Sequence, residues 1–521
     1  MPSILALALL LVTLALVMIT TLQSPEKDDI AWLLYVAHKW LAGKQLYVDL
    51  IEVNPPLIVW IYAVPAGIAN WLGAEPRLVA TPLFALVELA SAWWTATLLR
   101  NTAPIFTRRL PVFSLIGILL LAIPGVEFGQ REHLLIAAVL PYLVIFARVL
   151  NGEREPRRLS VATGVLAGLG CALKPTYALV FVTMEILALA RGFRPVRIGT
   201  VAAAVTMALY GLLVVIICPA FLEKAVPLAL ALYGGTDTAL SALLCDSWRV
   251  LAGLAVTMLL CWTSRDALRR REPFMRVLIL TLAAFAAGAS LSFVLEAKNW
   301  FYHRLPATVA TLLALLAWMA VMMPELKSRG WWRFRPILQL GLAVAVLVIF
   351  GMSDYSRLAP WVADAVDPGK TTIAKLERLV RQQHAHTYIA FSEWIGLGFP
   401  VVNNTGVAWA SRFDSMWALR GELWRMRHDG IAPKAWPIRR WVARDFVAGC
   451  PDLAVVDTRG AINYVAILVA SDASFAQAWS HYREIAVFDG LRVLKRITPD
   501  CKPELPALQH LSAANPEPAL P

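Results

Sequence analysis

Two adjacent carboxylates, Asp28 and Asp29, open a polar segment of residues 23–56 that follows the first apolar run of the chain. Apolar side chains then recur every three or four positions over residues 30–41, which predicts a helix lying at a water–lipid boundary. One aspartate is enough to cap such a helix, so the second is available for other chemistry. We therefore expect the pair to have a functional role in addition to any role in starting the helix.

Ionisable residues also cluster between later apolar runs. The stretch Glu127–His133 combines two acids, an arginine and an imidazole, Lys174 precedes a proline inside an apolar run, and residues 298–304 carry three potential cations beside aromatic side chains. A solvated turn, a snorkelling lysine and an aromatic belt would explain the three stretches separately. Charges near membrane depth are costly, however, and by default they mark functional sites.

The composition describes a membrane protein. Of its 521 residues, 59% are hydrophobic, and continuous apolar runs recur as far as Phe350, which excludes a soluble globule. The net charge of +12 comes from basic residues in short clusters between these runs. Such clusters report the orientation of the chain in the membrane, so we discount a nucleic-acid partner and expect membrane lipids as neighbours.

The charge pattern decides how many apolar runs cross the membrane. If the run Val59–Leu72 crossed it, the cluster Arg100, Arg108, Arg109 would lie outside, and every later basic cluster would also lie on the wrong side. If this run is interfacial or re-entrant, all of these clusters share the inner side. We therefore predict an all-α polytopic membrane domain of about 11 transmembrane helices, with interfacial helices in the first external loop and the carboxyl terminus outside.

The chain changes character near residue 352, where the membrane domain of residues 1–352 ends. Residues 353–505 alternate short β-like runs with helical stretches, which predicts a small external α/β domain. The β-like runs are Tyr388–Phe391, Pro400–Val402, Leu453–Val456 and Leu491–Leu494. Residues 506–521 are rich in Pro and Ala and predict a disordered tail. Cys450 and Cys501 both lie outside in this arrangement and can form a disulfide.

Several kinds of chemistry have no motif in the sequence. It contains no metal-ligand spacing, no nucleophile elbow and no phosphate-binding glycine loop. The sequence therefore assigns no cofactor and no metal ligand, although it leaves a divalent metal open.

The order of these motifs resembles the glycosyltransferase C superfamily, in particular the protein O-mannosyltransferases and the lipid A aminoarabinose transferases. The resemblance covers Met1 to about Phe350 and departs from those relatives in its Asp-Asp pair, where they usually carry Asp-Glu. It rests on the acidic pair, the later acidic loop, Gly43-Lys-Gln-Leu-Tyr47, Pro55-Pro56-Leu57, the Lys174-Pro175 break and the Lys…Tyr-His-x-x-Pro stretch that ends at Pro306.

The resemblance implies an inverting glycosyltransferase in the bacterial cytoplasmic membrane. It would move a sugar from a polyprenyl-phosphate donor to a glycan, lipid or protein acceptor on the periplasmic face. The departing lipid phosphate gains charge, so preorganised cations would stabilise the transition state. The expected catalytic residues are Asp28, as general base for the incoming hydroxyl group, and Asp29 and Glu132, which would position the base or the acceptor. The expected phosphate ligands are Lys174, Lys298, His303 and Arg304, and the expected acceptor or supporting residues are Glu52, Arg131, His133 and Tyr302.

A transporter or flippase of a lipid-linked or anionic substrate is the main alternative, because intramembrane charges also mark ion pathways. It predicts internal pseudo-symmetry, which the sequence does not display, and it gives no reason for a folded external domain. A non-catalytic scaffold is a third interpretation, and it leaves the charged external loops unexplained.

Overall fold

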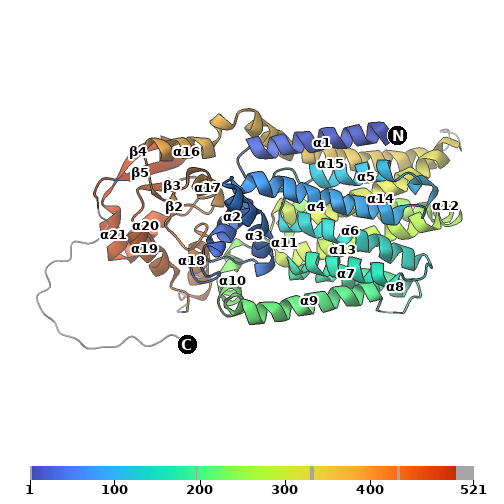
Figure 1. The fold of residues 1–521 in the computed structure, drawn as a ribbon, viewed down its shortest axis with the longest axis horizontal. Helices are drawn as coiled ribbons and strands as arrows, with labels where there is room; N and C mark the ends of the chain where they lie inside the picture. The colour runs from blue at the N-terminus through green and yellow to red at the C-terminus, as the bar shows by residue number, and fades with distance from the viewer. Residues whose placement is uncertain (1–2, 195, 329–333, 431–434, 500–521) are drawn as a thin grey trace, which may run out of the picture.

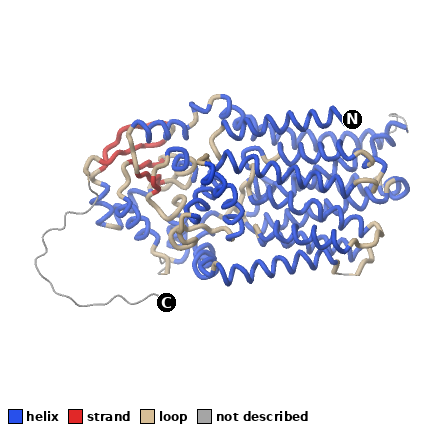
Figure 2. Tube along the Cα trace, in the orientation of Figure 1, coloured by secondary structure: helices blue, strands red, loops and turns tan. Residues whose placement is uncertain are grey.

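The computed structural model describes residues 3–194, 196–328, 334–430 and 435–499. Long helices run side by side in one bundle, and a smaller domain that holds the strands sits at one end of it (Figures 1 and 2). The structure confirms the predicted all-α membrane domain followed by a small α/β domain.

Eight helices in the described ranges are long and apolar enough to cross a membrane. They are α1 (Ser3–Gln23), α4 (Pro76–Leu99), α6 (Arg131–Leu150), α9 (Ile198–Ile217), α11 (Leu240–Thr263), α13 (Pro273–Glu296), α14 (Phe301–Ser328) and α15 (Phe334–Val366). The shorter helices α5 (Arg109–Ala122), α7 (Arg157–Ala172) and α8 (Leu179–Ala190) pack among them. The apolar runs that the charge pattern assigns to membrane spans all form these helices. The number of helices that cross the membrane stays a prediction.

Helix α6 lies at the centre of the bundle, because 83% of its most apolar 18-residue stretch is buried. It begins with Arg131, Glu132 and His133, all of which are buried. The central helix therefore carries charged groups at its tip, where they are costly unless they are paired.

Small residues bring α7 and α9 into backbone contact. A Cβ atom on Gly164 would lie 2.2 Å from the carbonyl oxygen of Gly199, and one on Gly168 would lie 2.6 Å from that of Ala203. Such close approach is how helices associate in lipid, where the hydrophobic effect does not drive them together. The packing fixes the end of α7, which Lys174 follows.

Three helices lie at the end of the bundle that faces the α/β domain (Figure 1). They are α2 (Asp28–Leu41), α3 (Pro56–Leu72) and α10 (Val226–Leu232). Helix α3 contains the run Val59–Leu72 and packs against α2 and α4. This placement agrees with an interfacial rather than a membrane-spanning α3.

The α/β domain is built on a sheet of order β2-β1-β3-β5-β4. Strand β1 pairs in parallel with β2 and β3, β5 is antiparallel to β3, and β4 is antiparallel to β5. The strands are β1 (Thr387–Phe391), β2 (Ala408–Trp409), β3 (Leu453–Asp457), β4 (Tyr482–Phe488) and β5 (Leu491–Arg496). The helices are α16 (Thr372–Gln382), α17 (Val401–Thr405), α18 (Trp417–Asp429), α19 (Ile438–Gly449), α20 (Tyr464–Ser471) and α21 (Ala473–Trp479).

Three of the four β-like runs are strands, whereas the prediction for Pro400–Val402 was wrong, because this run leads into α17. Helix α15 extends past residue 352, so the predicted domain boundary falls inside a helix. Cys450 is disulfide-bonded. Cys501 and the tail of residues 506–521 lie outside the described residues.

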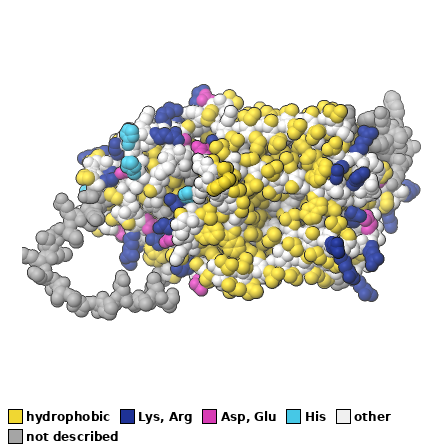
Figure 3. Space-filling view, in the orientation of Figure 1, with side chains coloured by type: hydrophobic (Ala, Val, Ile, Leu, Met, Phe, Trp, Pro, Cys, Tyr) yellow, Lys and Arg dark blue, Asp and Glu magenta, His cyan; other side chains and the backbone are white. Residues whose placement is uncertain are grey.

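Basic side chains gather at the end of the molecule opposite the α/β domain, and an apolar belt lies between the two ends (Figure 3). The loop between α4 and α5 belongs to the basic end, and the loop between α3 and α4 belongs to the other end (Figure 1). From the positive-inside rule we predict that the basic end faces the cytoplasm.

Cysteine labelling tests this orientation. We expect a membrane-impermeant maleimide to label Ala74→Cys in intact cells and to label Pro104→Cys only after permeabilisation, because the two loops lie on opposite sides. The parent chain provides the baseline, since Cys245 is exposed. The reverse pattern would invert the orientation, and labelling of both sites in intact cells would contradict the span count.

Candidate active site

A polar cavity of about 320 Å³ lies between the tip of the bundle and the α/β domain. We call it the carboxylate cavity, after the acidic side chains that line it from both sides. On the bundle side these are Asp28, Asp29 and Glu52, with Asn54, Arg131 and Tyr302 beside them, and on the α/β side the lining includes Glu393, Trp394, Asp414 and Arg420. Segments that are remote in sequence therefore meet at one polar site.

The aspartate pair occupies the first turn of α2, where the positive end of the helix dipole favours negative charge. Asp28 pairs with Lys27 at 2.8 Å and accepts a hydrogen bond from the backbone N–H of Asp29. Asp29 accepts a hydrogen bond of 3.0 Å from the side-chain amide of Gln130. Helix capping thus explains part of the role of Asp28, whereas Asp29 contacts another element altogether.

The two carboxylates differ in their surroundings. Burial, and then the neighbouring charge of Asp28, raise the pKa of Asp29 above its ordinary value. Burial also raises the pKa of Glu127, to about 7, and this side chain lies 3.9 Å from Lys27. Asp29 and Glu127 therefore bind a proton more tightly than they would in water, chiefly because they are buried.

Hydrogen bonds connect the loop between α2 and α3 to α2 and to the start of α6. Glu52 accepts a hydrogen bond of 2.5 Å from the indole N–H of Trp32 and one of 2.7 Å from the backbone N–H of Asn54. Arg131 donates to the side-chain oxygen of Asn54. Burial raises the pKa of Glu52. Glu52 and Arg131, predicted as supporting residues, thus line the cavity together with Tyr302.

A separate buried cluster surrounds Lys174, whose side chain is 12% exposed. Its Nζ atom lies 2.7 Å from Glu132 and 2.5 Å from Glu296. The ring of His303 lies 3.0 Å from Glu296 and 3.7 Å from Glu132. We call these four residues the lysine cluster. Glu132 thus faces Lys174 rather than the carboxylate cavity, and the charge of Lys174 is compensated within the protein.

Three other predicted site residues point elsewhere. Lys298 donates to the carbonyl oxygen of Tyr233 at 2.7 Å and pairs with Asp237, while burial lowers its pKa. Arg304 donates to the carbonyl oxygen of Asp246. His133 lies inside the bundle, where its Nδ1 accepts from the backbone N–H of Gly129 at 3.0 Å. The four predicted phosphate ligands, Lys174, Lys298, His303 and Arg304, are therefore absent from the lining of the carboxylate cavity.

The α/β domain adds an acid to the cavity that sequence reasoning missed. Burial, and then the nearby carboxylates of Glu52 and Asp29, raise the pKa of Asp414 to about 8. Asp414 lies two residues after Arg412, which forms an ion pair with Asp445. Only the docking of the two domains places Asp414 beside α2.

The described residues contain no group of three or more His, Cys, Asp or Glu side chains arranged to hold a metal ion. The structure thus adds no ligand set for the divalent metal that the sequence left open.

No known family profile matches the chain, and no curated protein matches it. Among solved structures, it is similar to the crystal structure of ArnT from Cupriavidus metallidurans bound to undecaprenyl phosphate. The TM-score is 0.53, and the match covers 97% of this chain and 100% of that chain at 13% identity. ArnT is a lipid A aminoarabinose transferase of the glycosyltransferase C superfamily. The chain therefore has the glycosyltransferase C fold, as the order of its motifs predicted.

Removal of the Lys174 charge tests the lysine cluster. Lys174→Met leaves Glu132 and Glu296 buried without their shared cation, so we expect it to lower the free energy of unfolding by about 3–5 kcal/mol. Lys44→Met, at an exposed position of the first loop, is the matched control and should change little. Thermal unfolding in detergent measures both variants. A Lys174→Met protein as stable as the parent would identify a snorkelling lysine instead.

The pH dependence of stability tests Asp414. Its pKa is raised from 3.8 to about 8, so between these values the folded protein holds a proton that the unfolded chain releases. This contribution is complete below about pH 4 and is lost as the pH rises toward 8. Relative to the parent, the free energy of unfolding of Asp414→Asn should therefore increase by at least about 1 kcal/mol between about pH 5 and about pH 8. Asp429→Asn, at an exposed position on α18, should show no such gain.

Proposed function

We propose that this protein is an inverting glycosyltransferase of the bacterial inner membrane. It moves a sugar from a polyprenyl-phosphate donor to a hydroxyl group of a glycan, lipid or protein acceptor. The observation that carries the proposal is the aspartate pair at the start of α2, which opens into a cavity between a glycosyltransferase C bundle and its α/β domain. The undecaprenyl phosphate bound to ArnT supports a polyprenyl-phosphate partner here.

The reaction exchanges one bond to the sugar for another. The acceptor oxygen attacks C1 of the sugar from the side opposite the donor phosphate, so the anomeric configuration inverts. The bond between C1 and the phosphate oxygen breaks, and the polyprenyl phosphate leaves with the electron pair. The hydroxyl proton passes to a carboxylate of the enzyme.

Asp28 is the proposed proton acceptor. Its side chain is 13% exposed, so it can meet a hydroxyl group that enters the cavity. Asp29 is the proposed positioning residue, because its hydrogen bond to Gln130 links α2 to the start of α6.

Arg131 is the first candidate for the donor phosphate. It lines the carboxylate cavity at the start of α6, where the helix dipole favours an anion, and its Nε atom has no hydrogen-bond partner among the described residues. Lys174 and His303 act indirectly, because both contact Glu132, which follows Arg131 in the chain. Lys298 and Arg304 support neighbouring loops.

The carboxylate cavity and the α/β domain would face the periplasm, because the basic end of the bundle would lie in the cytoplasm. A transporter accounts less well for this arrangement. Transporters bind their substrates near the middle of the membrane. The carboxylate cavity, where several of the predicted site residues meet, instead lies at the end of the bundle, under a folded domain (Figure 1).

Replacement of the proposed base tests the function. Asp28→Asn keeps the shape of the side chain and removes the proton acceptor, so turnover should fall by about two to four orders of magnitude while donor binding changes little. Mass spectrometry of lipids that co-purify with the protein identifies the donor, and release of its polyprenyl phosphate measures turnover.

Asp49→Asn is the matched control, since Asp49 is exposed on the loop between α2 and α3. We expect parental turnover from it. Parental turnover in Asp28→Asn would remove Asp28 from the role, and an inactive Asp29→Asn beside an active Asp28→Asn would reverse the order of the pair.

A further inference from the structure

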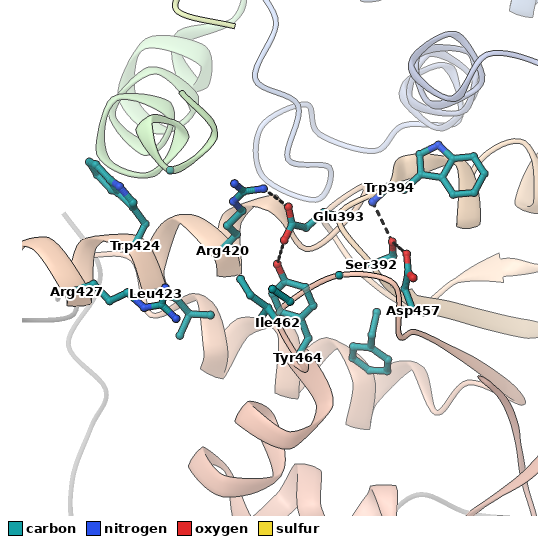
Figure 4. Close-up of a pocket in the computed structure, with 14 residues that line it drawn as sticks. Ser392, Glu393, Trp394, Arg420, Leu423, Trp424, Arg427, Asp457, Ile462 and Tyr464 are labelled. Atoms are coloured by element: carbon teal, nitrogen blue, oxygen red, sulfur yellow. Dashed lines mark hydrogen bonds and ion pairs between the residues drawn. The ribbon is translucent and has the colours of Figure 1, made fainter. Parts of the chain in front are cut away.

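A second cavity, of about 540 Å³, opens in the α/β domain (Figure 4). Ser392 and Glu393 follow β1 directly, and Asp457 ends β3. Because β1 and β3 are parallel neighbours, these residues meet at one edge of the sheet. The carboxyl ends of parallel strands are where open α/β sheets bind ligands. We call this space the sheet-edge cavity.

One face of α18 forms the opposite wall of the sheet-edge cavity. Arg420, Trp424 and Arg427 are spaced by four and three residues, which places them on the same side of the helix, and all three line the cavity (Figure 4). Trp394 and Tyr464 add aromatic surface. The volume lies in the range of small-molecule sites, and aromatic walls with a few polar groups are typical of such sites.

The acidic groups of this cavity are already paired. Glu393 forms an ion pair with Arg420 and accepts a hydrogen bond of 2.5 Å from the hydroxyl of Tyr464. Asp457 pairs with Arg459 at 2.8 Å and accepts from Ser392 at 2.7 Å. The cavity therefore offers a ligand little free negative charge.

Arg427 supplies the free charge instead. It is exposed, and in the described part of the chain it has neither an ion-pair nor a hydrogen-bond partner. Arg427 and Trp424 are about one helical turn apart on α18, and both line the cavity. A cation and aromatic surface in one cavity suit a ligand that is both anionic and ring-shaped.

The sheet-edge cavity adjoins the carboxylate cavity. Glu393, Trp394 and Arg420 line both of them. A ligand held at the sheet edge can therefore extend past these three side chains toward Asp28. The bundle side of the carboxylate cavity remains for the lipid-linked donor.

We propose that the sheet-edge cavity is the acceptor subsite and that it takes a saccharide carrying a phosphate or a carboxylate. The acceptor role rests on the proposed glycosyltransferase function, whereas the binding of an anionic saccharide does not depend on it. The sugar ring packs on Trp424 and Trp394, the anionic group receives a two-pronged hydrogen bond from Arg427, and a free hydroxyl is presented to the carboxylate cavity.

Ligand-observed NMR on the full-length protein in detergent tests the binding. The probes are glucose 1-phosphate, glucuronate and neutral glucose. We expect saturable binding of at least one anionic probe, with glucose at least about tenfold weaker, because a hydrogen bond to a charged group contributes about 1.5–3 kcal/mol. The probe that binds distinguishes a phosphate from a carboxylate. Absence of saturable binding by both anions, or equal binding of glucose, would overturn the proposal.

Two variants on α18 locate the site. Arg427→Gln should lower the affinity for the anionic probe by about tenfold or more. Arg425→Gln is the matched control, because Arg425 lies on the same helix outside the cavity lining and pairs with Asp429 at 3.0 Å. It should bind the probe as the parent does. Equal affinity of Arg427→Gln and the parent would place the anion elsewhere and overturn the assignment.

The acceptor role has its own readout. The anionic probe should inhibit release of polyprenyl phosphate by the parent, and Arg427→Gln should relieve that inhibition. Binding without inhibition would overturn the acceptor role while the saccharide site stands. If Asp28→Asn instead keeps parental turnover, the proposed base fails, and the NMR result is unaffected. Failure of the two proposals is therefore distinguishable.

Discussion

The lysine cluster is the interaction on which the geometry of the site depends. Lys174, Glu132 and Glu296 come from the turn after α7, the start of α6 and the end of α13, so one cation ties three segments of the bundle together. Replacement of a buried ion pair as a whole can be neutral, but removal of one partner is strongly destabilising. Because Glu132 follows Arg131 directly, the same contact sets where Arg131 stands in the carboxylate cavity.

Charge is distributed differently in the two cavities. The carboxylate cavity contains several acids held close together, and burial, with a smaller effect of the neighbouring acids, raises the pKa values of Asp29, Glu52 and Asp414. In the sheet-edge cavity the acids are paired, and Arg427 has no ion-pair or hydrogen-bond partner among the described residues. A neutral hydroxyl that must lose a proton suits the first environment, and an anionic group suits the second. One acceptor molecule with both groups would match the pair of cavities.

Local patterns in the sequence predicted the parts of the structure that depend on local physics. Apolar periodicity and the side of the basic clusters predicted the helices of the bundle and the placement of α3. The adjacency of Asp28 and Asp29 singled them out before any tertiary contact was known. In contrast, the ion pair between Lys174 and Glu296 was missed, because Glu296 is remote in sequence and ends a different apolar run. Pro400–Val402 was too short a run to separate a strand from the start of a helix.

The α/β contribution to the site depends on docking, which no local pattern records. Asp414 and Arg420 reach the carboxylate cavity only because their domain is seated on the bundle. Strand β4 was also missed, because most of its side chains are exposed or half-buried and its polar composition does not mark a core strand.

The continuity of α15 has a mechanical consequence. Its 33 residues form a rod about 50 Å long that begins near the basic end of the bundle and finishes at the α/β domain. Pro360 removes one backbone hydrogen bond and so concentrates bending at a single joint. Trp361 beside it donates to the hydroxyl of Ser24 at 2.9 Å, and Arg357 holds the carbonyl oxygens of Ile123 and Pro124. These contacts hold α15 against α1 and α5 at the point where the helix leads into the α/β domain, so residues outside the carboxylate cavity help to set how that domain sits above Asp28.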